Sequence, residues 1–459
     1  MNDAQENRYI TTIIIITSFA GPLLFGSISI ALPAMAQELA MNAIQMGWVT
    51  SVFSLTGSIL IFPFGRLADI SGRKKIFVLG VIINTVAVAV TAFSTSAYML
   101  IAFQLVQGIG FAMMVSSSTA LITSAYSPQQ RGKMLGMTAA AVYLGMSLGP
   151  TFGGLLIHNF GWRSIFAPAF ILQIPAIVLL FTKIKSEWAD AKGEKFDIIG
   201  SILLSIMLFC LLYGFSLLPI QSGILIIVIG IIAVILFILW ELKVKSPIFN
   251  ISLITRNRLF AFTSFAHFLF YTATFSITFI MSLYLQYIKG FSSQETGFIL
   301  LASPVIMAIF SPIAGRISDR VQPRVTVSIA IVVVFIGILL LFHATENQGL
   351  INIIIALVLL GLGSAFFISP NTNAIMSSVE RKHYGVASAT QATTRNIGIT
   401  FSMSVIILLF SLYIGNAAIT PEYYVPFMQS IRIAFIVFAG LCICGVIVSV
   451  TRGKVVISP

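Results

Sequence analysis

The stretch GRLADISGRKK, residues 65–75, decides the fold of this chain. It places four cations and one acid, Asp69, between two long apolar runs. Gly65 and Gly72 lack a Cβ atom, so the backbone can turn tightly at these two positions. A basic loop between apolar runs is typical of the cytoplasmic face of a membrane protein, where the cations alone would fix the topology. The spacing of the glycines, the acid and the cations needs a further explanation.

The composition is that of a polytopic membrane protein. The 459 residues are 58% hydrophobic and 9% charged, and the mean hydropathy is +1.03. Apolar runs of about 20 residues match the ~30 Å hydrocarbon layer of a bilayer. We therefore predict an all-α membrane protein with 14 spans, at residues 10–33, 46–65, 76–94, 98–122, 134–158, 165–183, 198–216, 223–242, 259–285, 295–315, 326–343, 351–371, 387–413 and 430–450.

The loop charges give the predicted orientation. Of the 26 Lys and Arg, 22 fall on one side of the 14 spans, three fall on the other, and Arg395 lies within a span. Positive loops stay in the cytoplasm, so we expect both termini there and the chain in the plasma membrane. The net charge of +12 comes from these short loops and forms no continuous basic face, which argues against a nucleic-acid partner.

An internal repeat divides the chain into two halves. GRLAD at residues 65–69 recurs as GRISD at residues 315–319. Three glycines of the first half also recur in the second half at one constant sequence offset. Gly108, Gly110 and Gly132 correspond to Gly361, Gly363 and Gly385. Parallel repeats of this kind are known in transporters. We predict an N-terminal six-helix bundle (1–183), a linker with helices seven and eight (184–258) and a C-terminal six-helix bundle (259–459).

A second motif lies in the fifth span, where residues 145–154 read GMSLGPTFGG. Its glycines at every fourth position share one helix face and allow a neighbouring backbone to approach closely. The proline removes a backbone hydrogen bond and favours a kink. Ordinary helix packing would explain the small residues but not the whole pattern. The residues of this motif are Gly145, Gly149, Pro150, Gly153 and Gly154.

Both motifs resemble those of the major facilitator superfamily of transporters. GRLADISGRKK is similar to its signature loop between helices 2 and 3, and GMSLGPTFGG to the antiporter motif of its fourteen-helix drug:proton antiporter branch. The resemblance covers essentially the whole chain. It implies two six-helix bundles with two extra helices, and proton-coupled export of apolar or amphipathic small molecules by alternating access. Protons, the substrate and the bilayer are then the expected partners of a monomer, with a proton gradient in place of a cofactor.

The resemblance also implies a conformational latch. In the family, the aspartate of the signature loop lies against a helix end across the bundle interface and helps to hold one conformation closed. A carboxylate is favoured at a helix N-terminus and beside guanidinium groups. The second copy lacks a glycine equivalent to Gly72 and contains Pro323, so we expect it to hold less firmly. The predicted latch comprises Gly65, Asp69, Gly72, Arg73, Asp319 and Arg320.

Two positions depart from the family pattern. Leu24 occupies the place of an aspartate in the first span, and Gln104 that of a buried arginine in the fourth. A cation in a low-dielectric cavity needs a carboxylate or an aromatic cage. We therefore expect neutral, zwitterionic or anionic substrates. The same departures leave open an uncoupled or anion-linked exporter or facilitator of a specific metabolite.

The polar residues within the spans are the candidates for the substrate or proton pathway. Buried amides often only join helices, Arg395 could extend towards the headgroups, and His267 could be packing among aromatic residues. The candidates are Gln104, Gln107, His267, Asn371, Asn373, Arg395 and Asn396.

An enzyme or a metal protein is not expected. The four histidines are scattered, and the three cysteines lie within apolar runs without metal-ligand spacing. The chain also lacks the phosphate-binding pattern G-x-x-x-x-G-K-[ST], so we expect no ATP-driven step of its own.

Overall fold

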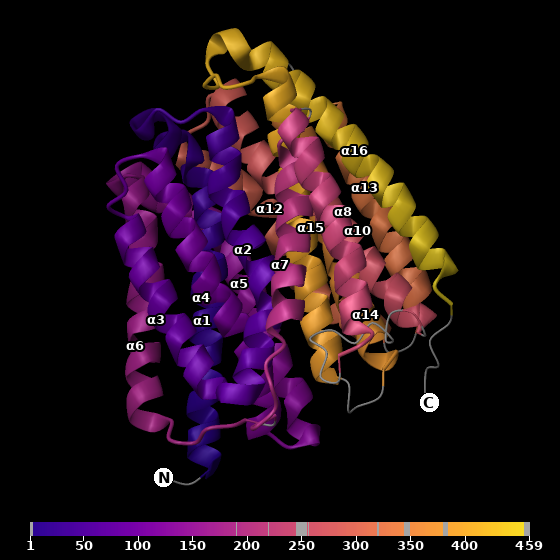
Figure 1. Cartoon of the computed structure of the whole chain (residues 1–459). Coiled ribbons are helices and arrows are strands. Elements are labelled where there is room, and N and C mark those ends of the chain that lie inside the picture. The colour runs from indigo at the N-terminus through magenta and orange to yellow at the C-terminus, as the bar shows by residue number, and fades with distance from the viewer. Residues whose placement is uncertain are drawn as a thin grey trace.

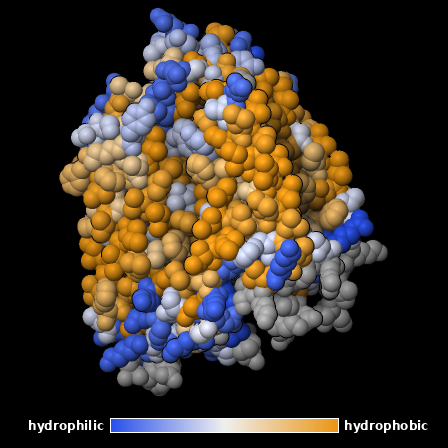
Figure 2. Space-filling model, viewed as in Figure 1, coloured by the Kyte–Doolittle hydropathy of each residue, from blue (hydrophilic) through white to orange (hydrophobic). Residues whose placement is uncertain are grey.

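The computed structural model describes residues 3–189, 191–218, 220–244, 255, 257–318, 321–343, 349–379 and 384–453. These residues form helices joined by short turns and loops, without a strand (Figure 1). Fourteen helical segments are long and apolar enough to cross a membrane, which confirms the predicted number of spans. Figure 2 shows a broad hydrophobic belt with hydrophilic residues gathered above and below it. This belt is the surface that a bilayer would cover.

The first half contains six long helices. Asn42 begins α2 with a capping box, in which its side chain and that of Gln45 each accept the other's backbone N–H. Ser96 caps α4 through the backbone N–H of Met99. The helices are α1 (Asp3–Leu39), α2 (Ala43–Ser71), α3 (Arg73–Thr91), α4 (Ala97–Ala125), α5 (Pro128–Phe160) and α6 (Phe166–Lys183), with a 3-10 turn η1 (Trp162–Ile165) before α6.

Two further helices, α7 (Ile198–Ser216) and α8 (Gln221–Glu241), precede the second half. The helices of the second half are α10 (Arg258–Leu283), α11 (Ser293–Leu300), α12 (Ala302–Ser318), α13 (Pro323–Phe342), α14 (Leu350–Ser377), α15 (Tyr384–Tyr413) and α16 (Tyr424–Thr451). A π-helical turn, η2 (Tyr284–Ile288), continues α10, and a 3-10 turn, η4 (Pro421–Tyr423), leads into α16.

The predicted tenth span is not one continuous helix. It is divided at Leu301 into α11 and α12. Pro304 lies one turn after Leu300 and has no N–H to donate to the carbonyl of that residue, which explains a break at this position.

The two halves pack by one repeated pattern. In the first, α1 contacts α5 and α6, α4 contacts α2 and α3, and α3 contacts α6. In the second, α10 contacts α15 and α16, α14 contacts α12 and α13, and α13 contacts α16. We call these sets the N-terminal and C-terminal bundles. The sequence repeat thus corresponds to a repeat in helix packing.

The repeated glycines occupy equivalent places in the two bundles. A Cβ atom on Gly108 of α4 would lie 2.8 Å from the carbonyl oxygen of Phe53 on α2, and Gly361 of α14 meets the Ser303 carbonyl on α12 in the same way. At each position only glycine lets the two helix backbones approach this closely.

The helices α7 and α8 lie outside the two bundles, in front of them in Figure 1. The helix α7 packs against α2 and α15, where the rings of Trp48 and Tyr213 lie 5.3 Å apart and those of Phe215 and Phe401 4.6 Å apart. The pair therefore covers one side of the seam between the bundles.

The helix α1 begins at the lower end of the molecule in Figure 1, and α16 runs downwards along its right side. We call the lower end the proximal end and the opposite one the distal end. The loop of residues 65–75 is proximal, and the C-terminal end of α5 and the start of α11 are distal.

Candidate functional site

A cavity of about 290 Å³ lies between the two bundles. Its walls come mainly from α1, α2, α4 and α5 of the N-terminal bundle and from α10, α12, α14 and α15 of the C-terminal bundle, with further residues from α3, α6 and α11. We call it the central cavity. Its size is close to the lower end of the range usual for small-molecule sites.

A row of aromatic rings crosses the central cavity. Phe275 of α10 lies 5.4 Å from Phe25 of α1, which lies 5.5 Å from Phe53 of α2, and Phe53 lies 4.8 Å from Phe111 of α4. All four side chains line the cavity. Such tilted ring pairs offer a large apolar surface to a flat ligand.

Three nitrogen atoms at the cavity have no hydrogen-bond acceptor. They are Nε2 of Gln104, Nε of Arg395 and Nδ2 of Asn396, all buried. An unsatisfied buried donor costs ~1–3 kcal/mol. The cavity lining contains no Asp or Glu among the described residues. Leu24, at the family's acidic position, also lines the cavity.

Arg395 does not extend to the membrane surface. It lines the central cavity, within electrostatic range of Tyr143, Tyr271 and His267. Tyr143 of α5 and Tyr271 of α10 lie next to each other at the cavity, so they bring the two bundles together beside Arg395. The sequence analysis missed both tyrosines, because a lone tyrosine in an apolar span carries no distinguishing pattern.

Gln107 has partners where Gln104 has none. The side-chain Nε2 of Gln107 donates to the Thr91 hydroxyl at 2.7 Å. The backbone carbonyl of Gln107 accepts a hydrogen bond from Nδ2 of Asn84 at 3.2 Å. Nε2 of Gln173 in turn donates to Oδ1 of Asn84 at 3.0 Å. These side chains join α3, α4 and α6 in a polar network inside the N-terminal bundle, so Gln107 acts there as a link between helices.

Three other candidates lie in helix contacts of the C-terminal bundle. His267 is buried, its Nδ1 lies 3.3 Å from the Thr394 hydroxyl, and its ring packs edge-on against Tyr271. Asn371 accepts a hydrogen bond from the buried Arg452 at 3.2 Å. Nδ2 of Asn373 donates to the hydroxyl of Ser318 on α12 at 3.0 Å, close to the proximal end.

The motif on α5 serves two different neighbours. Gly145, Gly149 and Gly153 face α1 of their own bundle, and a Cβ atom on Gly149 would lie 2.7 Å from the Leu23 carbonyl oxygen. Gly154 instead faces the other bundle, where a Cβ atom would lie 2.5 Å from the carbonyl oxygen of Ser293. Only the last glycine of the motif therefore lies in the contact between bundles.

Close backbone contacts join the bundles at the distal end. A Cβ atom on Gly297 of α11 would lie 2.6 Å from the Pro150 carbonyl oxygen, so α11 and α5 nearly touch. The Thr151 hydroxyl donates to the Gly297 carbonyl at 3.1 Å. The Ser282 hydroxyl donates to the backbone carbonyl of Ser29 at 2.8 Å. We call these contacts the distal closure, and they separate the central cavity from the distal end.

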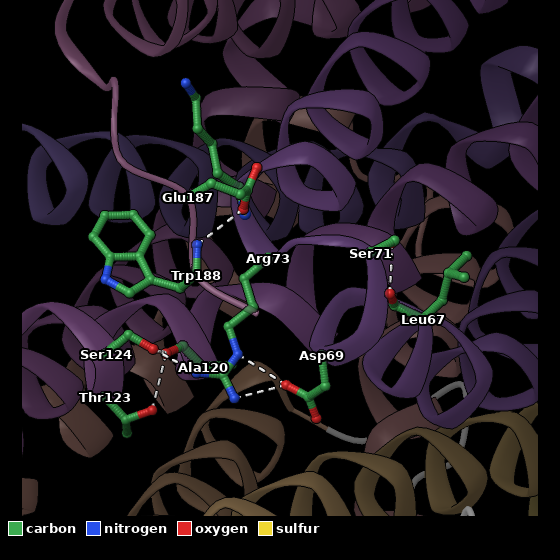
Figure 3. Close-up of polar contacts among 10 residues, drawn as sticks. Leu67, Asp69, Ser71, Arg73, Ala120, Thr123, Ser124, Glu187 and Trp188 are labelled. Atoms are coloured by element: carbon green, nitrogen blue, oxygen red, sulfur yellow. Dashed lines mark hydrogen bonds and ion pairs between the residues drawn. The ribbon is translucent and has the colours of Figure 1, made fainter. Parts of the chain in front are cut away.

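The predicted latch acid bonds within its own bundle. The Arg73 guanidinium donates twice to Oδ1 of Asp69, at 2.7 and 2.8 Å, and once to the Ser124 hydroxyl of α4 (Figure 3). Asp69 is one third exposed, and Arg73 is nearly buried. Asp319 and Arg320 of the second copy lie outside the described residues.

The linker that follows α6 forms hydrogen bonds to the loop of residues 65–75. The backbone N–H of Arg73 donates to the Trp188 carbonyl at 2.9 Å, and that of Ala191 to the Asp69 carbonyl at 3.0 Å. Arg66 forms a 2.5 Å ion pair with Glu194. We call residues 184–189 and 191–194 the strap.

Glu187 of the strap caps the start of α3. Its two oxygens accept the backbone N–H groups of Lys74 and Lys75 at 2.8 and 3.1 Å, which is favourable at a helix N-terminus. Gly72 has φ +121°, and a Cβ atom there would lie 2.6 Å from the Glu187 carboxyl carbon. The second glycine of the signature loop therefore makes room for Glu187.

Comparison with protein families decides the classification. The family model of the Major Facilitator Superfamily matches residues 14–255 and 263–455. The chain belongs to the Major Facilitator Superfamily. Its members and fold neighbours are transporters, so the chain is a multi-pass membrane transporter and not an enzyme.

Superfamily members with a similar sequence include antibiotic-resistance proteins. The methylenomycin A resistance protein of Bacillus subtilis (strain 168) is 30% identical, over 81% of this chain and 80% of that protein. The riboflavin transporter RibZ of Clostridioides difficile (strain 630) is 28% identical, over 97% of this chain and 98% of that protein. Relatives named for multidrug resistance place this superfamily member in the drug:proton antiporter branch.

Solved structures share the superfamily fold. A POT family transporter in complex with a thioalcohol-conjugated peptide superposes with a TM-score of 0.73 at 14% identity, covering 97% of this chain and 96% of that one. The human organic anion transporter MFSD10 superposes with a TM-score of 0.63 at 16% identity, covering 98% and 100%.

Proposed function

We propose that this chain exports an apolar or amphipathic small molecule across the plasma membrane in exchange for protons. The observation that carries the proposal is the central cavity, which lies between two repeated bundles and is closed by the distal contacts. Relatives of the chain are named for resistance to antibiotics, which supports outward transport.

The orientation follows from the loop charges. The proximal loops contain most of the cations, so we place the proximal end and both termini in the cytoplasm. The distal closure then belongs to an inward-facing state of a monomer. In the outward-facing state the distal contacts part, and Asp69 moves from its pairing within the bundle to a contact across the proximal interface.

An uncoupled or anion-linked exporter of a specific metabolite is the second candidate. The lining of the central cavity favours it, because Arg395 is present and no carboxylate is found among its described residues to carry a coupling proton. Under proton exchange, the proton would have to bind nearer a membrane face, at Asp69 or Glu295, or at His267.

Proton movement in vesicles tests the proposal. Purified protein is reconstituted with a pH-sensitive dye inside and exposed to riboflavin, to the neutral antibiotic chloramphenicol and to the dication methyl viologen. We expect proton flux that depends on a neutral compound and little response to the dication. Empty vesicles are the control. Uptake at one rate with and without a pH gradient would favour the second candidate.

A further inference from the structure

The amide side chains that line the central cavity separate into two sets by whether their nitrogen atoms have hydrogen-bond acceptors. Asn84, Gln107 and Gln173 donate to one another or to neighbouring groups, so each amide nitrogen of this network has an acceptor. Gln104 and Asn396 each have a buried amide nitrogen without an acceptor. The second set therefore presents hydrogen-bonding capacity to whatever fills the cavity.

The unpartnered groups share one chemical character, since all are N–H donors. Gln104 and Asn396 are 1% and 3% exposed and line the cavity together with Arg395, whose Nε is also unpartnered. A side-chain amide can rotate to present its oxygen, but a guanidinium has only donors and keeps its charge. These three groups together therefore favour hydrogen-bond acceptors, and negative charge near Arg395.

Both amides can be placed relative to Phe111, the ring at one end of the aromatic row. Gln104 and Phe111 are seven residues apart on α4, which puts them on the same face about 10 Å apart. Asn396 is close to Phe111, because a Cβ atom on Gly57 would lie 3.2 Å from the Phe111 ring and 3.9 Å from Nδ2 of Asn396. A flat ligand about 10 Å long that stacks on Phe111 would therefore have both amides nearby.

We propose that the central cavity binds an aromatic compound, neutral or anionic, with carbonyl or carboxylate acceptors at both ends. Gln104 of the N-terminal bundle takes one acceptor, and Asn396 and Arg395 of the C-terminal bundle take the other. This inference rests on the proposed function, because it assigns the transported substrate to the central cavity. A ligand that bridges the bundles binds best when they are in one arrangement, so its occupancy biases the conformational equilibrium.

Three naphthalene probes of nearly equal size test the inference. The probes are 2,6-naphthalenedicarboxylate, 2-naphthoate and 2-naphthylmethylammonium, measured by equilibrium dialysis against the full chain in lipid nanodiscs, with empty nanodiscs as the blank. We expect the dicarboxylate to bind about tenfold more tightly than the monocarboxylate, because of one further charge-assisted hydrogen bond. The cation should bind most weakly.

Matched variants assign the donors. Gln104→Leu should make the dicarboxylate bind no more tightly than the monocarboxylate. Arg395→Met should make the monocarboxylate bind no more tightly than the cation. Gln107→Leu is the control one helical turn away. It should lower Tm, because it breaks the network to Thr91, and leave both affinity ratios unchanged.

The order of the wild-type affinities stands as a test even if a variant fails to fold. The inference is overturned if the cation binds as tightly as the monocarboxylate, if no probe binds, or if folded Gln104→Leu and Arg395→Met variants keep the wild-type ratios. The proposed function can fail separately. Ordered binding without flux in vesicles would contradict transport alone, and flux of cations without anion preference would contradict this inference alone.

Discussion

The two ends of the interface between the bundles differ in their chemistry. At the distal end, backbone meets backbone at Gly154 and Gly297, and a few hydroxyl groups donate across the join. At the proximal end, charges dominate, and Asp69 and Arg73 bond within one bundle. The distal closure therefore depends on the absence of side chains, whereas the residues of the predicted latch differ by carrying an ion pair.

The largest expected effect is that of Gly154→Leu. Its side chain would meet the Ser293 carbonyl, so the distal closure cannot form. We expect transport in vesicles to fall by more than about tenfold, since overpacking in a tight contact costs ~1–3 kcal/mol or more. In a cysteine-free background, a cysteine at Ser29 should become reactive from the distal side.

Gly136→Leu is the matched control for this variant. Gly136 lies on the same helix, and a Cβ atom there meets nothing within 4 Å. Equal transport by the two variants would mean that the distal closure has no part in the cycle.

Asp69→Asn tests the proximal end. The neutral amide keeps the size of the side chain but loses the ion pair with Arg73, and it would be held less well by the helix N-terminus proposed as its partner in the outward-facing state. We expect a severe loss of transport, of about tenfold, with normal insertion and folding, because each charge-assisted bond is worth ~1.5–3 kcal/mol. Initial rates at matched protein levels measure it. Transport at the wild-type rate would contradict the latch.

Gly149→Leu sharpens the distinction within the motif of α5. Both its neighbours, Leu23 and Gly26, belong to α1 of the same bundle. We expect a lower Tm in detergent and unchanged access of the Ser29 cysteine, because the clash is inside a bundle. A shift in cysteine access equal to that of Gly154→Leu would show that Gly149 also acts between the bundles.

The smallest effect is expected for Glu187→Gln. The exposed carboxylate loses its charge at the start of α3, and the amide can still accept one N–H through its oxygen. Transport should fall less than about twofold, since exposed contacts of this kind contribute little. Trypsin should cut the strap faster at Lys185 and Lys192. Unchanged proteolysis would mean that Glu187 does not hold the strap.

Much of the fold could be predicted from the sequence. The number of spans and the membership of the superfamily follow from hydropathy and from residues 65–75, and both are confirmed. The break at Leu301 was not predicted, although Pro304 gave a local signal for it. The proton coupling, the domain boundaries and the roles of the site residues stay predictions.

The sequence alone determined the chemical inventory of the site. It predicted that Leu24 and Gln104 occupy positions that are charged in the family pattern, and it showed that Arg395 is the one cation within a predicted span. These properties depend only on residue type and position along an apolar run, because the bilayer acts on each span through its hydropathy.

The tertiary structure decided which of these residues have partners. Gln104 and Gln107 are one turn apart on α4 and equally buried, yet only Gln107 meets Thr91 of α3. Gly153 and Gly154 are adjacent, yet one faces α1 and the other α11. A rotation of about 100° between successive residues of a helix selects the neighbour, and that neighbour comes from a distant part of the chain.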